Sequence, residues 1–222
     1  MTGAVSMVWR VLVVFAMWGA LAAAVAGAPQ RPVLIVGDSL SAAYNMPEAA
    51  GWVSLLEDRL AEATATPPKV INASISGETT AGGLSRLPAL LETHQPGVVV
   101  IELGGNDGLR GLAPGQVRDN LDRMIALGGE AGAKVVLVGI DIPPNYGAAY
   151  RERFRAVFSD LAQTHSVALL PFFLEGVALE AGMMQSDGIH PTAAAQPRLL
   201  ENIWPLLAEV LELEAEVEVT GS

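Results

Sequence analysis

The sequence predicts a three-layer α/β/α fold built on a central five-stranded parallel sheet. Five short runs rich in Val, Ile and Leu recur along the chain, and longer amphipathic segments separate them. Each run is almost continuously apolar, as expected of strands that are covered on both faces. Strands that alternate with helices in this way predict a parallel sheet with helices on both sides. Neither an internal repeat nor a change in composition divides the chain, so residues 29–211 are expected to form a single domain.

The elements can be placed in order along the chain. The predicted strands cover residues 33–36, 69–73, 98–103, 134–140 and 167–170. The predicted helices cover residues 48–62, 80–93, 115–131 and 146–165, and a last helix begins after Pro191. Pro197 and Pro205 are expected to bend or shorten that helix, since proline lacks the backbone N–H. Residues 212–222, ELEAEVEVTGS, are expected to be an acidic, frayed tail.

The N-terminal segment has the pattern of a secretory signal peptide. Arg10 is the only charged residue before the apolar stretch 11–28, which ends in small residues. Cleavage is expected near 26–28, with Ala24-Val25-Ala26 preferred because the later site would leave Pro29 directly after the cut. The protein is therefore expected to be exported to the periplasm or secreted. The alternative is a retained membrane anchor, because the run approaches the length that spans a bilayer.

Composition excludes several classes of function. The formal charge is −11 and becomes −12 without Arg10, and no basic cluster of the kind that binds nucleic acid is present. The acidic excess also argues against capture by anionic membranes, so after cleavage no stable membrane partner is expected. The absence of Cys excludes disulfides, thiol catalysis and cysteine metal sites. We expect a monomer that acts on a small molecule without a metal or cofactor.

Small and polar residues follow the predicted strands, where open α/β sheets form their sites. Ser39 follows the first strand within Gly-Asp-Ser, and Gly77 follows the second within ASISGETT. The third strand runs into GGNDG, which contains Asn106, and the fifth leads to DGIH, residues 187–190. Because the carboxyl ends of parallel strands share one edge of the sheet, these groups are expected to lie close together.

His190 is the strongest candidate for a general base among three histidines. His94 precedes a turn and is expected to point into water, and His165 lies near a helix end, where a cation suits the helix dipole. Asp187, three residues before His190, can hold the imidazole and stabilise its cation. The alternative is an ordinary Asp-Gly turn followed by a His near a helix start.

Ser39 fits two roles, nucleophile or helix N-cap, and the hydrolase elbow G-x-S-x-G is absent. Three donors could stabilise an oxyanion: the Ser39 amide at the expected helix start, the Gly77 amide and the Asn106 side chain. Each donor taken alone is a weak signal, and GGNDG is also the sequence of an ordinary tight turn. Asp38, next to Ser39 in the chain, is expected to fix the turn.

The order of these motifs resembles the SGNH (GDSL) hydrolase family. Its four blocks match as GDSL at 37–40, Gly77 in SISGET, GGND at 104–107 and DGIH at 187–190. RLPALL, PPNYG, LLPFF and MMQSDGIHP look like the secreted multifunctional thioesterase/lysophospholipase branch, which includes arylesterases. The resemblance implies a flavodoxin-like fold and a serine hydrolase of fatty acyl esters and thioesters. By the same resemblance, Ser39, Asp187 and His190 are catalytic, and Ser39, Gly77 and Asn106 form the oxyanion hole.

Several interpretations stay open at this point. Loop 141–149 either forms an apolar wall for an acyl chain, through Ile142, Pro143, Pro144 and Tyr146, or is only a proline-stiffened connection. Glu102 is either a buried, hydrogen-bonded carboxyl or a residue at the sheet edge. The alternatives to a fatty acyl hydrolase are a carbohydrate O-acetyl esterase and a non-catalytic exported binding module.

Overall fold

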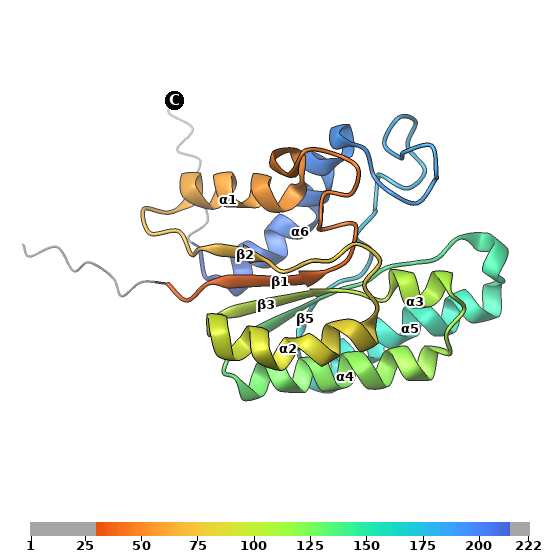
Figure 1. The fold of residues 1–222 in the computed structure, drawn as a ribbon, viewed down its shortest axis with the longest axis horizontal. Helices are drawn as coiled ribbons and strands as arrows, with labels where there is room; N and C mark the ends of the chain where they lie inside the picture. Colours follow the sequence, from red (N-terminus) through yellow and green to blue (C-terminus); the bar gives the residue numbers. More distant parts are fainter. Residues whose placement is uncertain (1–29, 214–222) are drawn as a thin grey trace, which may run out of the picture.

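A computed structural model describes residues 30–213, and its centre is a five-stranded parallel sheet. The strand order is β2-β1-β3-β4-β5. The strands are β1 (Val33–Gly37), β2 (Val70–Asn72), β3 (Val98–Glu102), β4 (Lys134–Val138) and β5 (Ala168–Leu170). All their carboxyl ends point to the same edge of the sheet (Figure 1). The predicted fold is confirmed.

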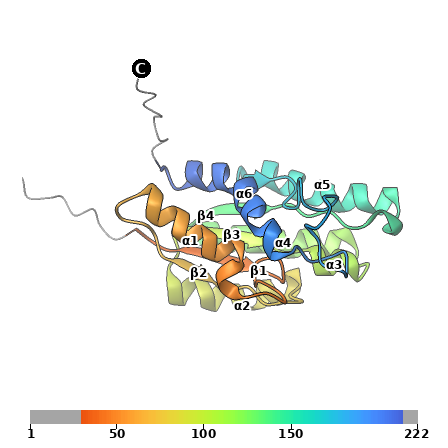
Figure 2. The same cartoon turned by 90° about the horizontal axis from the view of Figure 1, so that it is seen from above.

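Helices cover both faces of the sheet. On one face lie α1 (Trp52–Ala63) and α6 (Gln196–Val210), which pack against each other. On the other face α4 (Pro114–Glu130) packs between α2 (Thr80–His94) and α5 (Ala148–His165). Figure 2 shows the two layers from above, with the short helix α3 (Gly105–Leu109) at the carboxyl edge.

Burial explains why the central strands read as continuous apolar runs. Every residue of β1 and of β3 is buried, because both faces of these strands meet helices. Val33 pairs with Val70 on one side and with Val98 on the other, so β1 lies inside the sheet. The central strands thereby hold the loops that follow them in fixed positions.

Three helices begin later than the sequence predicts. The helix expected from residue 146 begins at Ala148, after a 3₁₀ turn at 144–146. Residues 48–50 form a 3₁₀ turn and Gly51 is extended, so α1 begins at Trp52. After another 3₁₀ turn at 193–195, α6 begins at Gln196. Pro197 occupies its first turn, where no amide is needed. Pro205 lies inside α6, which continues to Val210, so this proline does not end the helix.

The chain after α6 turns back on the helix. The Leu213 amide donates to the Ala208 carbonyl, and Lys134 Nζ bonds Glu212 at 2.6 Å, so residues 212 and 213 are not frayed. The rest of the expected tail and the expected signal segment, residues 1–28, lie outside the described residues. Within residues 30–213, no helix combines the length and apolar character needed to cross a membrane.

Candidate active site

The candidate site lies where the connections from the sheet diverge. The chain leaves β1 toward β2 on one side, whereas β3 lies on the other side of β1. Asp38 and Ser39 follow β1, and Gly105 and Asn106 follow β3, so the two loops face each other across this switch point. Open α/β sheets bind ligands in the crevice that such a divergence creates.

Ser39 lies in a series of tight turns and not at the start of a helix. The Leu40 amide donates to Asp38 Oδ1 at 3.0 Å, so Asp38 does fix the turn. Ala43 and Asn45 have φ angles of 52° and 58°, a left-handed conformation that interrupts helical hydrogen bonding. The prediction of a helix N-terminus at Ser39 is therefore wrong, and a helix dipole does not assist its amide.

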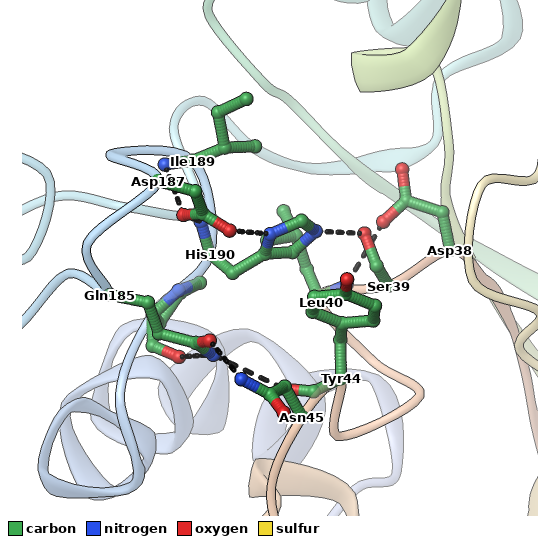
Figure 3. Close-up of polar contacts among 10 residues, drawn as sticks. Asp38, Ser39, Leu40, Tyr44, Asn45, Gln185, Asp187, Ile189 and His190 are labelled. Carbon is green, nitrogen blue, oxygen red and sulfur yellow. Dashed lines mark hydrogen bonds and ion pairs between the residues drawn. The ribbon is translucent and has the colours of Figure 1, made fainter.

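His190 links Ser39 to Asp187 by hydrogen bonds. Its Nε2 lies 2.9 Å from Ser39 Oγ, and its Nδ1 lies 2.7 Å from Asp187 Oδ2 (Figure 3). Asp187 Oδ1 also accepts the backbone amides of Ile189 and His190. The His190 amide, followed by its imidazole and the Ile189 amide, lowers the pKa of Asp187 to about 2. The carboxylate is therefore ionised at neutral pH, and His190 Nδ1 carries the proton that it donates to Asp187.

Asn106 reaches the site from the short helix α3. Its Nδ2 donates to Asp38 Oδ2 at 2.9 Å, which fixes the amide beside the Ser39 loop and leaves its second N–H free for another acceptor. Asp107 anchors the helix from behind, since its carboxylate accepts the amide and the hydroxyl of Thr80. Burial raises the pKa of Asp38 to about 6, although its bonds from Leu40 and Asn106 oppose this.

Gly77 lies on the adjacent loop, beside the end of β1. The Ile75 amide donates to the Gly37 carbonyl at 3.1 Å, and Arg110 Nη2 donates to the Gly77 carbonyl at 3.1 Å. Gly77 has a φ of 80°, which a glycine adopts without strain. It does not line the cleft that holds Ser39 and His190.

A cleft of about 550 Å³ opens at Ser39 and His190, and its walls are mostly apolar. The apolar wall is formed by Leu40, Leu109, Ile140, Ile142, Pro143, Pro144, Phe172, Leu174, Ala178, Leu179, Met184 and Ile189. Asp141 also lines it, held by Arg151 at 2.6 Å. Of the four loop residues predicted to contact an acyl chain, Tyr146 does not line the cleft; its hydroxyl donates to the Leu109 carbonyl and its ring packs against the core.

Glu102 is a buried, hydrogen-bonded carboxyl at the end of a central strand, not at the sheet edge. Its Oε2 accepts the Ser41 hydroxyl at 2.7 Å and the Asp38 amide at 3.3 Å. Trp52 Nε1 in turn donates to Ser41 Oγ. Burial, with the neighbouring Asp38 charge, raises the pKa of Glu102 well above its usual range. The open question about this residue is thus answered by the structure.

The other histidines lie away from the site. His165 Nε2 pairs with Asp122 Oδ1 at 2.8 Å on neighbouring helices. His94 ends α2 and is half-buried, whereas the sequence suggested that it points into water. Among residues 30–213, no three His, Asp or Glu side chains are grouped so that they could hold a metal ion.

Two residues at the site were not predicted from the sequence. The Tyr44 ring lies against the His190 imidazole, with ring centroids 4.2 Å apart. The Gln185 side chain bonds both Asn45 and the Tyr44 carbonyl (Figure 3). Their only signal in the sequence is that each lies within five residues of Ser39 or of His190.

The comparisons with known proteins agree with this geometry. The model of the "GDSL-like Lipase/Acylhydrolase family" matches residues 35–197. "Esterase TesA" of Pseudomonas aeruginosa is 56% identical over 83% of this chain and 91% of its own length. "Thioesterase 1/protease 1/lysophospholipase L1" of Escherichia coli K12 is 50% identical over 74% of this chain and 77% of its own length.

A solved structure shows the same likeness in three dimensions. The psychrotrophic esterase EstA from Pseudoalteromonas sp., solved inhibited by monoethylphosphonate, superimposes with a TM-score of 0.78. It is 40% identical, and the match covers 82% of this chain and 100% of that one. Since the family model spans Ser39, Asn106, Asp187 and His190, this chain is a hydrolase that belongs to the GDSL-like lipase/acylhydrolase family.

Proposed function

We propose that the chain hydrolyses fatty acyl esters and thioesters through an acyl-enzyme on Ser39. The observation that carries this proposal is the continuous relay from Asp187 through His190 to Ser39 at the mouth of an apolar cleft. Serine is a weak nucleophile until an adjacent base removes its proton, and His190 Nε2 is within reach of that proton.

Acylation begins when Ser39 Oγ attacks the substrate carbonyl carbon while its proton moves to His190 Nε2. The carbonyl π electrons pass to the oxygen, which becomes the oxyanion of a tetrahedral intermediate. The ionised Asp187 stabilises the imidazolium formed at this moment. The intermediate then collapses, the alcohol or thiol leaves with the proton from Nε2, and the acyl group stays on Ser39.

Deacylation repeats the same steps with water. His190 Nε2 takes a proton from water, the hydroxide attacks the acyl carbon, and the proton returns to Ser39 as the carboxylic acid leaves. In both halves the second Asn106 N–H and the Ser39 amide donate to the oxyanion. We propose that the Gly77 amide joins them from the adjacent loop, although Gly77 does not itself line the cleft. One such donor is worth about 10²–10³ in kcat in other serine hydrolases.

The substrate class follows from the cleft together with the relatives. Twelve apolar side chains line the cleft, and its volume of about 550 Å³ is more than an acetyl group needs. Relatives carry the names esterase, arylesterase and thioesterase/lysophospholipase. These features support a small acyl ester or lysolipid as substrate, with Ile142, Pro143 and Pro144 in contact with the acyl chain.

The first test replaces Ser39 and His190 by alanine, one at a time. Because the members of such a relay act as a unit, each variant should lose at least about 10⁴ in kcat on p-nitrophenyl butyrate. A fluorophosphonate probe should label the wild type and leave Ser39→Ala unmarked. Activity retained in Ser39→Ala would contradict the nucleophile and favour a binding module or another mechanism.

The second test measures kcat/KM over p-nitrophenyl esters from acetyl to palmitoyl. The apolar cleft predicts that acyl chains of four or more carbons are preferred over acetyl, since each buried methylene adds about 0.8 kcal/mol. A maximum at acetyl would instead indicate a carbohydrate O-acetyl esterase.

We also propose that the protein is exported and acts as a monomer, with residues 1–28 removed as a signal peptide and residues 29–211 forming its single domain. The charged start, apolar run and small-residue ending of the N-terminal segment support export. N-terminal sequencing of protein recovered from the periplasm or medium tests the cleavage near 26–28. Light scattering of the mature protein tests the monomer.

A further inference from the structure

The loop that follows Ser39 brings an aromatic ring onto the imidazole of His190. The rings of Tyr44 and His190 are 4.2 Å apart at an interplanar angle of 32°. Tyr44 is 42% exposed, and no hydrogen bond of its hydroxyl is found within residues 30–213. The ring therefore contributes its face at this position, and its hydroxyl is not what holds it there.

The backbone on either side of Tyr44 has an unusual conformation. Ala43 and Asn45 on either side both have left-handed φ angles. Asparagine tolerates this conformation, but for alanine it is unfavourable. The Tyr44 amide donates to the Ser39 carbonyl, and the Met46 amide to the Ala43 carbonyl. Strained residues persist where the surrounding structure holds them, and they gather at functional sites.

Gln185 joins this loop to the loop that carries His190. Its Nε2 donates to the Tyr44 carbonyl at 3.1 Å and to the Pro191 carbonyl at 2.9 Å. Its Oε1 accepts a hydrogen bond from Asn45 Nδ2 at 3.2 Å. The backbone N–H of Gln185 donates to the His190 carbonyl at 2.7 Å. A single half-buried side chain thus bridges two segments that lie 141 residues apart in the chain (Figure 3).

We propose that Tyr44 is a positioning residue for His190 and that Gln185 holds the two loops in the register that stacks the rings. The proposal rests on the proposed function, since it concerns the base of that reaction. Asp187 holds the imidazole only at Nδ1, about which the ring can still tilt. The Tyr44 face restricts this tilt, so that Nε2 stays directed at Ser39 Oγ.

The Tyr44 ring face also lies against the imidazolium that forms during the reaction. Aromatic faces attract cations, and the imidazole becomes cationic each time it takes a proton from Ser39 or from water. Asp187 and Asp38 are the other charged groups that act on it. Because Tyr44 touches the base, its removal is expected to slow the chemical steps more than it weakens substrate binding.

The test compares Tyr44→Leu with Tyr44→Phe on p-nitrophenyl butyrate. Tyr44→Leu removes the aromatic face and is expected to lower kcat about 10-fold or more, with KM within about twofold, because a small misplacement of a catalytic group is costly. Tyr44→Phe keeps the face and should stay within about twofold of the wild type. Gln185→Leu removes the bridge and should lower kcat about 3- to 10-fold, which tests the same contact from the other loop.

Tyr150→Leu is the matched control, since it makes the same replacement at a ring that stacks on Tyr146 and Phe154 and does not line the cleft. Its kcat should be unchanged. Proton NMR gives a second readout: the His190 ring signals should carry a ring-current shift that Tyr44→Leu abolishes and Tyr44→Phe retains.

Three results would overturn the proposal. These are a wild-type kcat in both Tyr44→Leu and Gln185→Leu, an equal loss in Tyr44→Leu and Tyr44→Phe, and a raised KM with unchanged kcat in Tyr44→Leu. Ser39→Ala is measured beside them. If it is inactive while the Tyr44 and Gln185 variants are normal, only the positioning role fails; if it is active, the proposed function itself fails.

Discussion

At the scale of single residues, the buried Glu102 is expected to make the stability of the fold depend on pH. It lies under the Ser39 loop. Within residues 30–213, its carboxyl group accepts hydrogen bonds only from the Ser41 hydroxyl and the Asp38 amide. Its raised pKa means that the folded protein keeps a proton that the unfolded chain has released at the same pH. The free energy of unfolding must then fall as the pH rises through this interval.

The free energy of unfolding of Glu102→Gln, relative to that of the wild type, is predicted to rise as the pH goes from 5 to 8. Glutamine has nearly the same shape, can accept the Ser41 hydroxyl and does not ionise, so it escapes the cost of a buried charge. Urea unfolding of both proteins at the two pH values measures the change. Asp38, with its pKa of about 6, is present in both the wild type and Glu102→Gln, so the comparison is made between two proteins that both contain this second buried carboxyl. Glu57→Gln on the exposed face of α1 is the control, and stability curves of wild type and Glu102→Gln that stay parallel would contradict the argument.

Contacts between residues that are close in the sequence could be predicted from the sequence. Asp187 and His190 are three residues apart, and their contact was predicted from that spacing. The pairing of His165 with Asp122, across 43 residues, and the stacking of Tyr44 on His190 depend on how distant elements pack. Neither leaves a periodic or spacing signal in one sequence.

At the scale of elements, adjacent glycines of α4 have opposite surroundings. A Cβ on Gly128 would lie 2.7 Å from Val135 Cγ2 of β4, whereas a Cβ on Gly129 would meet nothing within 4 Å. Gly128 therefore allows the helix to approach the sheet closely. Gly129 is exposed and has only the entropic cost of a glycine in a helix.

Gly128→Ala and Gly129→Ala are predicted to shift stability in opposite directions. Gly129→Ala should stabilise by up to about 1 kcal/mol through helix propensity. Gly128→Ala should destabilise by about 1–2 kcal/mol, because the strain of overpacking a buried valine exceeds the same propensity gain. Thermal or urea unfolding of both variants gives the comparison, and equal effects would show that α4 does not need this close approach.

The elements were predictable to the extent that they carry long apolar patterns. The five strands follow their apolar runs within one or two residues. The helix α3 was missed because GGNDGL has the composition of a turn, and it is held by the contact between Asp107 and Thr80 of another helix. The expected helix start at Ser39 failed because Ala43 and Asn45 adopt left-handed angles that composition does not reveal.

At the scale of the whole molecule, one buried apolar core joins the sheet to the helices on both of its faces. The buried apolar cluster runs from Val33 to Leu207 and includes residues of every strand except β5, whose residues pack against it half-buried. Arg31 ties the start of β1 to the ends of two helices, through the carbonyls of Gln95 and Gly132. Small single domains with one continuous core mostly unfold as a unit, and we expect the same of this domain.

A chain limited to residues 30–213 is predicted to unfold in a single cooperative transition and to keep kcat on p-nitrophenyl butyrate within about twofold. The reason is that the core and every residue of the candidate site lie inside these limits. Calorimetry tests the cooperativity through equal calorimetric and van't Hoff enthalpies. Two transitions, or an inactive but folded product, would show that the terminal segments belong to the working domain.

The distance along the chain between Ser39 and His190 has a consequence for the order of events during synthesis. These residues are 151 positions apart, and the nucleophile is made long before its base. A growing chain that has formed β1 to β4 already holds Ser39 and Asn106, yet among residues 30–138 no side chain accepts the proton of the Ser39 hydroxyl. Hydrolysis can therefore begin only after the loop that carries His190 has been synthesised and has packed against the loop that carries Ser39. The order of these segments in the chain thus determines when activity begins.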